Sequence, residues 1–145
     1  MLLLAFDTAT PSIGVAVHDG ENVIGQAHGE GAMAHGELLA PAIKSAMAAA
    51  GRTMSELTDV AVGVGPGPFT GLRVGVVTAL TLGQTLGLRT HGVCTLDTLA
   101  AEAADQVGTE FIAAIDARRK EVYWARYDAA GRPLTGPQVD RPGEV

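Results

Sequence analysis

The sequence predicts an α/β domain with a mixed sheet and flanking helices. Three short apolar segments come first, with a tight-turn signal at Asp19-Gly20 between the second and the third. Helical and strand-like patterns then alternate, which is typical of strands joined by helical crossovers. Hydrophobic residues make up 47% of the 145 residues and charged residues 18%, so the chain has the composition of a packed core rather than of a disordered segment.

The three opening segments are predicted to form an antiparallel meander. Leu2–Phe6 is a continuous apolar run, the pattern of a strand covered on both faces. In Ile13–Val17 large apolar residues alternate with Gly and Ala, which also favours a strand. Asp19-Gly20 predicts a tight turn because Gly accepts positive φ, and Val23–His28 is the return strand.

Crossover elements follow the meander. Apolar residues three and four apart predict a helix over about 38–50, which Gly51 ends. Pro41 must lie near its first turn or kink it. The next expected elements are a strand, a helix, a strand and a helix, at Asp59–Val64, Thr70–Leu86, Thr90–Val93 and Leu96–Val107.

The last part of the chain predicts a hairpin. Phe111–Ile115 and Glu121–Tyr127 are strand-like, with a polar turn at Asp116–Lys120 between them, and the chain from Arg132 onward shows no periodicity. This order of elements predicts a ribonuclease-H-like domain over residues 1–95. Residues 96–145 are predicted to begin a second, similar domain that the chain does not complete.

Charge and cysteine content exclude several classes of protein. The formal net charge of −6 argues against a chain that binds nucleic acid by itself. The single Cys94 excludes a disulfide framework and a multi-cysteine zinc site. The apolar start is short and runs directly into Asp7, which fits neither a signal peptide nor a membrane span. We therefore expect a cytoplasmic protein with no membrane partner.

A glycine-rich loop over residues 63–71 lies between a predicted strand and a predicted helix, where backbone N–H groups can hold an anion. Its spacing differs from a P-loop, no Lys follows, and two prolines remove donors. The loop is therefore either a rigid turn or a vestigial phosphate loop. The candidate residues of the second interpretation are Asp7, Thr8, Gly65, Gly67 and Gly71.

Other chemistry-bearing residues are scattered. The four histidines lack metal-ligand spacing, and Cys94 follows an apolar strand, which favours a buried, inert thiol. Arg118-Arg119-Lys120 lies in the predicted hairpin turn, either as a solvated turn or as a contact for an acidic partner or an RNA backbone. The sequence predicts no catalytic residue, no metal and no cofactor.

The two crossover helices carry few charges. In the second, Gly71, Gly75, Ala79, Gly83 and Gly87 recur every four residues and form a ridge of small residues. The ridge packs either inside the domain or against a partner, and two under-charged helices in a small domain favour a partner. The predicted interface is Leu38, Leu39, Ala42, Ile43, Ala46, Leu72, Gly75, Val76, Ala79 and Gly83.

Several motifs together resemble one known family. They are Ala5-Phe6-Asp7-Thr8-Ala9-Thr10, Ala34-His35-Gly36-Glu37-Leu38-Leu39-Ala40-Pro41, Gly65-Pro66-Gly67-Pro68-Phe69-Thr70-Gly71-Leu72-Arg73-Val74-Gly75 and Asp116-Ala117-Arg118-Arg119-Lys120-Glu121-Val122-Tyr123. In residue type and in order along the chain, these motifs are similar to those of the TsaB family, also called YeaZ. Pro68 stands where that family usually has Ser, and Cys94-Thr95 stands where it is usually rich in Ser. Family members are also longer than this chain.

The resemblance implies an actin-like (ASKHA) fold and a part in making threonylcarbamoyladenosine next to the tRNA anticodon. Family members are non-catalytic partners of the transferase TsaD, which they bind through a bundle of helices from both proteins. The ATPase TsaE joins the two, a homodimer can form through the same surface, and tRNA is reached only through the complex.

Two alternatives stay open. Relatives carry an M22 glycoprotease label, which would make this chain a metallopeptidase. Weak ATP binding of the sugar-kinase type, through Asp7 and the loop from Gly65 to Gly71, is the other.

Overall fold

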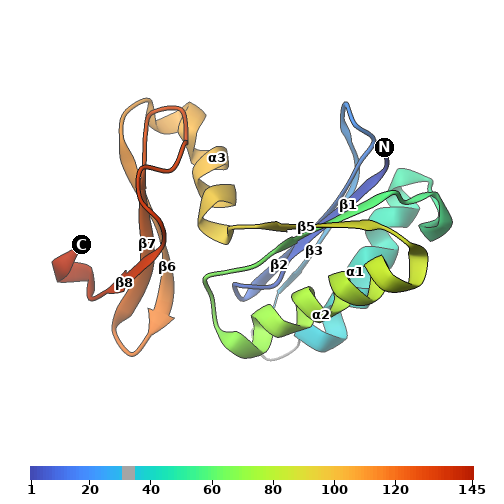
Figure 1. Cartoon of the computed structure of the whole chain (residues 1–145), viewed down its shortest axis with the longest axis horizontal. Coiled ribbons are helices and arrows are strands. Elements are labelled where there is room, and N and C mark those ends of the chain that lie inside the picture. Colours follow the sequence, from blue (N-terminus) through green and yellow to red (C-terminus); the bar gives the residue numbers. More distant parts are fainter. Residues whose placement is uncertain (31–34) are drawn as a thin grey trace. The chain divides into compact units, whose positions relative to one another are not determined.

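The computed structural model describes residues 1–30 and 35–145 and divides into two compact units (Figure 1). The first unit contains Met1–Val64 and Phe69–Gly92, and the second contains Gly65–Pro68 and Val93–Val145. Gly31 of the loop before the first helix, and Ala34 of the second matching motif, lie outside the described residues.

The first unit is built on a five-stranded sheet in the order β3-β2-β1-β4-β5. Its strands are β1 (Leu3–Asp7), β2 (Ser12–His18), β3 (Val23–Glu30), β4 (Asp59–Gly63) and β5 (Arg89–Val93). β2 is antiparallel to β1 and to β3, whereas β1 and β4 are parallel. The predicted α/β fold with a mixed sheet is confirmed.

The turn between β2 and β3 forms at the predicted Asp19-Gly20. Asp19 Oδ1 accepts hydrogen bonds from the N–H groups of Glu21 and Asn22, at 2.8 and 2.7 Å. Gly20 has φ +102°, a conformation that residues with a Cβ rarely adopt. These local contacts fix the register that places Ile13, Val15 and Val17 in the core.

Helices α1 (His35–Ala50) and α2 (Phe69–Leu86) lie on the same side of this sheet (Figure 1). α1 packs against β2 and β3, and α2 packs against β4. Gly51 and Gly87, both at φ +66°, follow their last residues as predicted. Pro41 lies inside α1, beyond its first turn. The short helix η1 (Met54–Glu56) leads from α1 into β4.

The second unit packs α3 (Thr95–Val107) against β6 (Phe111–Arg118) and β7 (Glu121–Tyr127). Its core includes Leu96, Ala100 and the fully buried Tyr127. β8 (Gln138–Asp140) adds a third strand in the order β6-β7-β8, and η2 (Pro142–Glu144) follows. Two sequence predictions were wrong here: β6 continues past Ile115 to Arg118, and a strand lies in the segment after Arg132 that showed no periodicity.

Within the part of the chain that the structure describes, no helix is both long and apolar enough to cross a membrane.

Candidate functional site

The hydroxyl of Thr8 ties the end of β1 to the start of α2. Thr8 Oγ1 donates to the carbonyl of Gly71 at 2.6 Å and accepts from the N–H of Gly75 at 3.0 Å. An α-helix pairs the N–H of each residue with the carbonyl four residues earlier, so Gly75 and Gly71 form one such pair. The fully buried Thr8 side chain therefore bonds to both members of one pair in the helix.

Glycine is required at this junction because the backbones approach closely. A Cβ on Gly75 would lie 2.6 Å from Thr8 Oγ1, and a Cβ on Gly71 would lie 2.9 Å from the Thr8 carbonyl oxygen. A Cβ on Gly63 would collide with the carboxylate of Asp7. These glycines allow dense packing within the first unit, and the space beside them is already filled.

The residues of the predicted phosphate loop fall into both units. Asp7, Thr8 and Gly71 belong to the first unit, and Gly65 and Gly67 belong to the second. Gly65 donates its N–H to Thr95 Oγ1 at 3.1 Å and accepts from the Thr95 N–H at 2.8 Å. Anion binding needs backbone N–H groups that face the ligand, whereas those of Gly65 and Gly75 bond within the protein. A vestigial phosphate loop stays a prediction.

Three of the histidines bond within the described part of the chain. His18 Nδ1 accepts from the Gly20 N–H at 3.0 Å. His35 is buried, and its Nε2 lies 2.7 Å from the Thr10 carbonyl oxygen. A carbonyl only accepts, so this nitrogen carries the proton. His91 Nε2 lies 2.9 Å from Asp59 Oδ2. Over residues 1–30 and 35–145, no three His, Cys, Asp or Glu side chains gather closely enough to hold a metal ion.

Asp59 is a buried carboxylate that links β4 to the edge strand β5. Its Oδ1 accepts from Thr58 Oγ1 at 2.6 Å and from Arg89 Nη2 at 2.9 Å, in addition to the His91 contact on Oδ2. The Thr58 hydrogen bond, followed by those of His91 and Arg89, holds the pKa of Asp59 well below its usual range. Because every contact is internal, we assign this cluster to stability.

Cys94 and Asp97 line a hollow of about 380 Å³ in the second unit, together with the segment Pro133–Pro137. Tyr127 donates its hydroxyl to Asp97 Oδ1 at 2.7 Å, and burial together with that carboxylate raises the pKa of Tyr127. Cys94 is half-buried rather than fully enclosed. The predicted inertness of its thiol stays a prediction.

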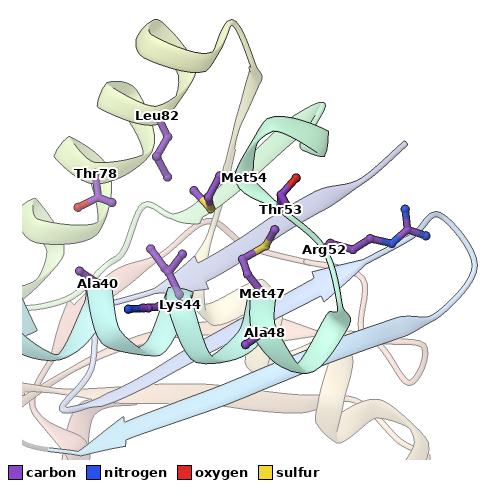
Figure 2. A pocket seen from close by; sticks show the side chains of 10 residues that line it. Ala40, Lys44, Met47, Ala48, Arg52, Thr53, Met54, Thr78 and Leu82 are labelled. Atoms are coloured by element: carbon purple, nitrogen blue, oxygen red, sulfur yellow. The ribbon is translucent and has the colours of Figure 1, made fainter.

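An apolar groove of about 530 Å³ lies between α1 and α2. Figure 2 shows the side chains of Met47, Met54 and Leu82 converging on it from α1, η1 and α2. Lys44 and Arg52 also line it, and Arg52 pairs with Glu56 at 3.4 Å. We call this feature the helical groove; its lining residues are Ala40, Ile43, Lys44, Met47, Ala48, Arg52, Thr53, Met54, Thr78 and Leu82.

Most of the predicted interface residues lie under the helices rather than on their outer surface. Leu39, Ala42, Ile43, Ala46, Gly75 and Ala79 are all buried within this chain. Ile43 alone of the ten lines the helical groove. Leu38, Leu72, Val76 and Gly83 are half-buried. The small-residue ridge faces the chain's own sheet, since a Cβ on Gly75 would meet Thr8 and Val62, and a Cβ on Gly83 would meet Thr90.

Sequence reasoning included only Val76 of an exposed apolar stripe on α2. Phe69, Val77 and Leu80 are 75%, 50% and 59% exposed, and the half-buried Val76 lies among them. Their spacings of seven, eight and eleven residues from Phe69 place them on one helical face. We call these four residues the α2 stripe. The signal in the sequence is that α2 is apolar on a second side, whereas one apolar side is enough to pack it on the sheet.

Comparison with known proteins identifies the family. The family model described as "TsaD: tRNA N6-adenosine threonylcarbamoyltransferase" matches residues 29–145. The TsaB protein of Escherichia coli is 39% identical over 129 residues, which are 88% of this chain and 55% of that protein. The chain belongs to the TsaB family, also called YeaZ. An uncharacterized protein of Mycobacterium tuberculosis is 42% identical over 99% of this chain, which spans 66% of that relative's length.

Solved structures agree with this membership of the TsaB family. The structure titled "YeaZ from Pseudomonas aeruginosa" has a TM-score of 0.88 and 32% identity, and the match covers 97% of this chain and 68% of that one. A more distant neighbour is the activator of 2-hydroxyisocaproyl-CoA dehydratase from Clostridium difficile, with a TM-score of 0.58 and 13% identity. That likeness concerns the fold alone, and the predicted actin-like fold is confirmed.

Proposed function

We propose that this chain takes part in the synthesis of threonylcarbamoyladenosine in tRNA as a non-catalytic subunit that binds TsaD. The proposal rests on the curated TsaB relatives, whose names state a role in this biosynthesis, and on the helical groove. The groove is the observation that carries the partner-binding part of the proposal.

The helical groove has the properties of a site for a partner helix. Its floor is apolar, with two methionines whose flexible side chains adapt to the surface that they meet. An amphipathic helix binds such a groove by placing residues spaced three and four apart into it. The α2 stripe is a second exposed apolar surface, on another side of α2 from the groove residues Thr78 and Leu82. Its Phe69 is of the aromatic type that is enriched at interfaces.

A non-catalytic role is supported by how the polar groups of the loop region are used. The Thr8 hydroxyl and the N–H groups of Gly65 and Gly75 are engaged in internal hydrogen bonds, so a nucleotide or an oxyanion would have to displace them. The metallopeptidase alternative gains no support from the described histidines, of which His35 and His91 bond to Thr10 and Asp59.

The remaining partners belong to the same proposal. TsaE would join the complex of this chain with TsaD. A second copy of this chain would compete with TsaD for the helical groove and the α2 stripe. Both expectations come from the family resemblance, and the exposed apolar surface of α2 supports a surface that is covered in use.

The test is light scattering coupled to size exclusion on this chain mixed with TsaD from the same cell. Two variants make a matched pair: Ala48→Glu places a carboxylate in the helical groove, and Ala49→Glu places the same side chain on the next, equally exposed residue outside it. Glu is compatible with a helix, so both variants should fold.

We expect a one-to-one complex for the wild type and for Ala49→Glu, and a much weaker complex for Ala48→Glu. A Glu at position 48 fills part of the groove, and its carboxylate has to lose water when a partner helix enters, even where Lys44 or Arg52 pairs with it. If both variants form the complex to the same extent, TsaD does not bind at the groove. If the wild type forms no complex, the proposed function is refuted.

A further inference from the structure

The turn between β6 and β7 carries three cationic residues in succession in the left-handed backbone conformation. Arg118 pairs with Glu121, so Arg119 and Lys120 form a two-residue loop. The φ angles of Arg118, Arg119 and Lys120 are 64°, 52° and 64°. All three side chains are exposed. We call these three residues the basic tip.

This loop departs from the sequence that its geometry favours. Two-residue hairpin loops with positive φ at both positions are usually Asn-Gly or Asp-Gly, because other residues are strained in that conformation. A pair such as Asn-Gly would therefore be more stable in this loop than Arg119-Lys120. Strained backbone kept against such a preference points to a role for the side chains.

The charges of the basic tip are uncompensated by ion pairs. Three of the ten Lys and Arg residues of this acidic chain lie in it. Over the residues that the structure describes, none of the three forms a salt bridge, whereas Arg126 and Arg132 of the same unit pair with Glu110 and Asp128.

Two acidic residues flank the basic tip. Asp116 Oδ1 accepts from the backbone N–H of Arg118 at 2.8 Å, and Glu121 stands opposite Arg118. The potential of exposed charges decays over about 8 Å at physiological salt, so acidic residues elsewhere in the chain act weakly on the tip, whereas Asp116 and Glu121 leave it a local charge of about +1.

We propose that the basic tip binds the phosphate backbone of RNA. Phosphate contacts need exposed, unpaired cations and no apolar surroundings. A contact with an acidic protein would be expected to combine the cations with large apolar side chains, and the tip's neighbours in the sequence, Asp116, Ala117 and Glu121, include none. The inference rests on the proposed function, and it adds a direct contact where the family resemblance implies that tRNA is reached only through the complex.

The test uses a fluorescein-labelled anticodon stem-loop RNA and measures its anisotropy with this chain, alone and mixed with TsaD. The variant Arg119→Asn with Lys120→Gly removes two charges and installs the loop sequence that this geometry favours, so it should fold at least as well as the wild type. Arg132→Gln, which removes an exposed charge beyond the opposite end of β7, is the matched control.

We expect the double variant to lower the affinity about 25-fold near 0.1 M salt, since each lost phosphate contact removes a factor of about 5. The slope of log affinity against log salt should fall by about 1.4 between about 50 and 200 mM salt. Arg132→Gln should change neither the affinity nor this slope. This pattern supports the proposal.

Three results would overturn it: no RNA binding by the wild type in either setting, an affinity that the double variant leaves unchanged, or a double variant that keeps RNA binding and loses TsaD. The last result would assign the basic tip to an acidic protein surface. Light scattering of the same mixtures reports TsaD binding separately, so a failure of the proposed function is distinguishable from a failure of the tip.

Discussion

Two buried polar side chains of the first unit are held in place by hydrogen bonds as well as by apolar contacts. Thr8 and Asp59 are both buried, and each has its polar atoms bonded to groups on another element. Buried polar groups are tolerable only when they are bonded in this way. Composition and spacing pointed to Thr8 as a loop residue, but neither could show that its hydroxyl enters a helix sixty residues later in the chain.

Replacing Thr8 with Val should lower the free energy of unfolding by about 1–3 kcal/mol. Val keeps the shape of the side chain, but it removes the hydroxyl that bonds to the Gly71 carbonyl and to the Gly75 N–H in a buried place. Urea denaturation measures the change. Thr81→Val, which removes an exposed hydroxyl of the same helix, should change stability by less than about 0.5 kcal/mol. Equal effects would contradict the role given to Thr8.

The depressed pKa of Asp59 predicts a pH-dependent stability. A carboxylate with a lower pKa in the folded state contributes stability that is complete above its unfolded pKa and is lost as the pH falls through the folded value. Asp59→Asn should therefore be less stable than the wild type at pH 7, with a gap that narrows below about pH 4. Urea denaturation at several pH values measures it. A gap that stays constant with pH would contradict the assignment.

At the scale of elements, the sequence predicted the helices and most strands, because most of them have a clear apolar pattern and a glycine or turn signal at their ends. β8 was missed because its three residues, Gln138–Asp140, have no period of their own and pair with β7 through Val122, Tyr123 and Trp124. The end of β6 was missed because Asp116 was taken for a turn residue, although it pairs with Val122.

The predicted interface shows the limit of periodicity. The strongest helical period marks the face that packs on the sheet, so residues selected by that period are mostly core residues such as Leu39 and Ala46. The α2 stripe lies out of phase with it. Separating the two faces requires knowing which side of the helix the sheet covers, and only the structure gives that.

Replacing Leu80 with Asp should weaken TsaD binding at least 30-fold and change stability little, since Leu80 is 59% exposed in the chain alone. Isothermal titration calorimetry measures the affinity. Leu99→Asp, at a leucine on α3 that is 37% exposed, is the control and should leave the affinity unchanged. Equal losses in the two variants would indicate a general effect of the added charge and count against the α2 stripe.

At the scale of the whole molecule, the chain joins an α/β unit with one apolar helical side to a smaller unit that carries a basic tip. The first unit uses its glycines and Thr8 to pack α2 against β1 and β4. The outer surfaces of α1 and α2 then remain apolar and open, which fits a subunit that acts by being bound. The proposals assign partner binding to the first unit and RNA contact to the second.

Hydrogen–deuterium exchange of this chain with and without TsaD tests the central claim most directly, because it reports both binding and its location. The account predicts slower exchange in peptides from α1 and α2 when TsaD is present, with peptides from β2 and β3 unchanged. Amide exchange that TsaD does not alter, or protection confined to β6, β7 and β8, would contradict the claim that this protein binds its partner through α1 and α2.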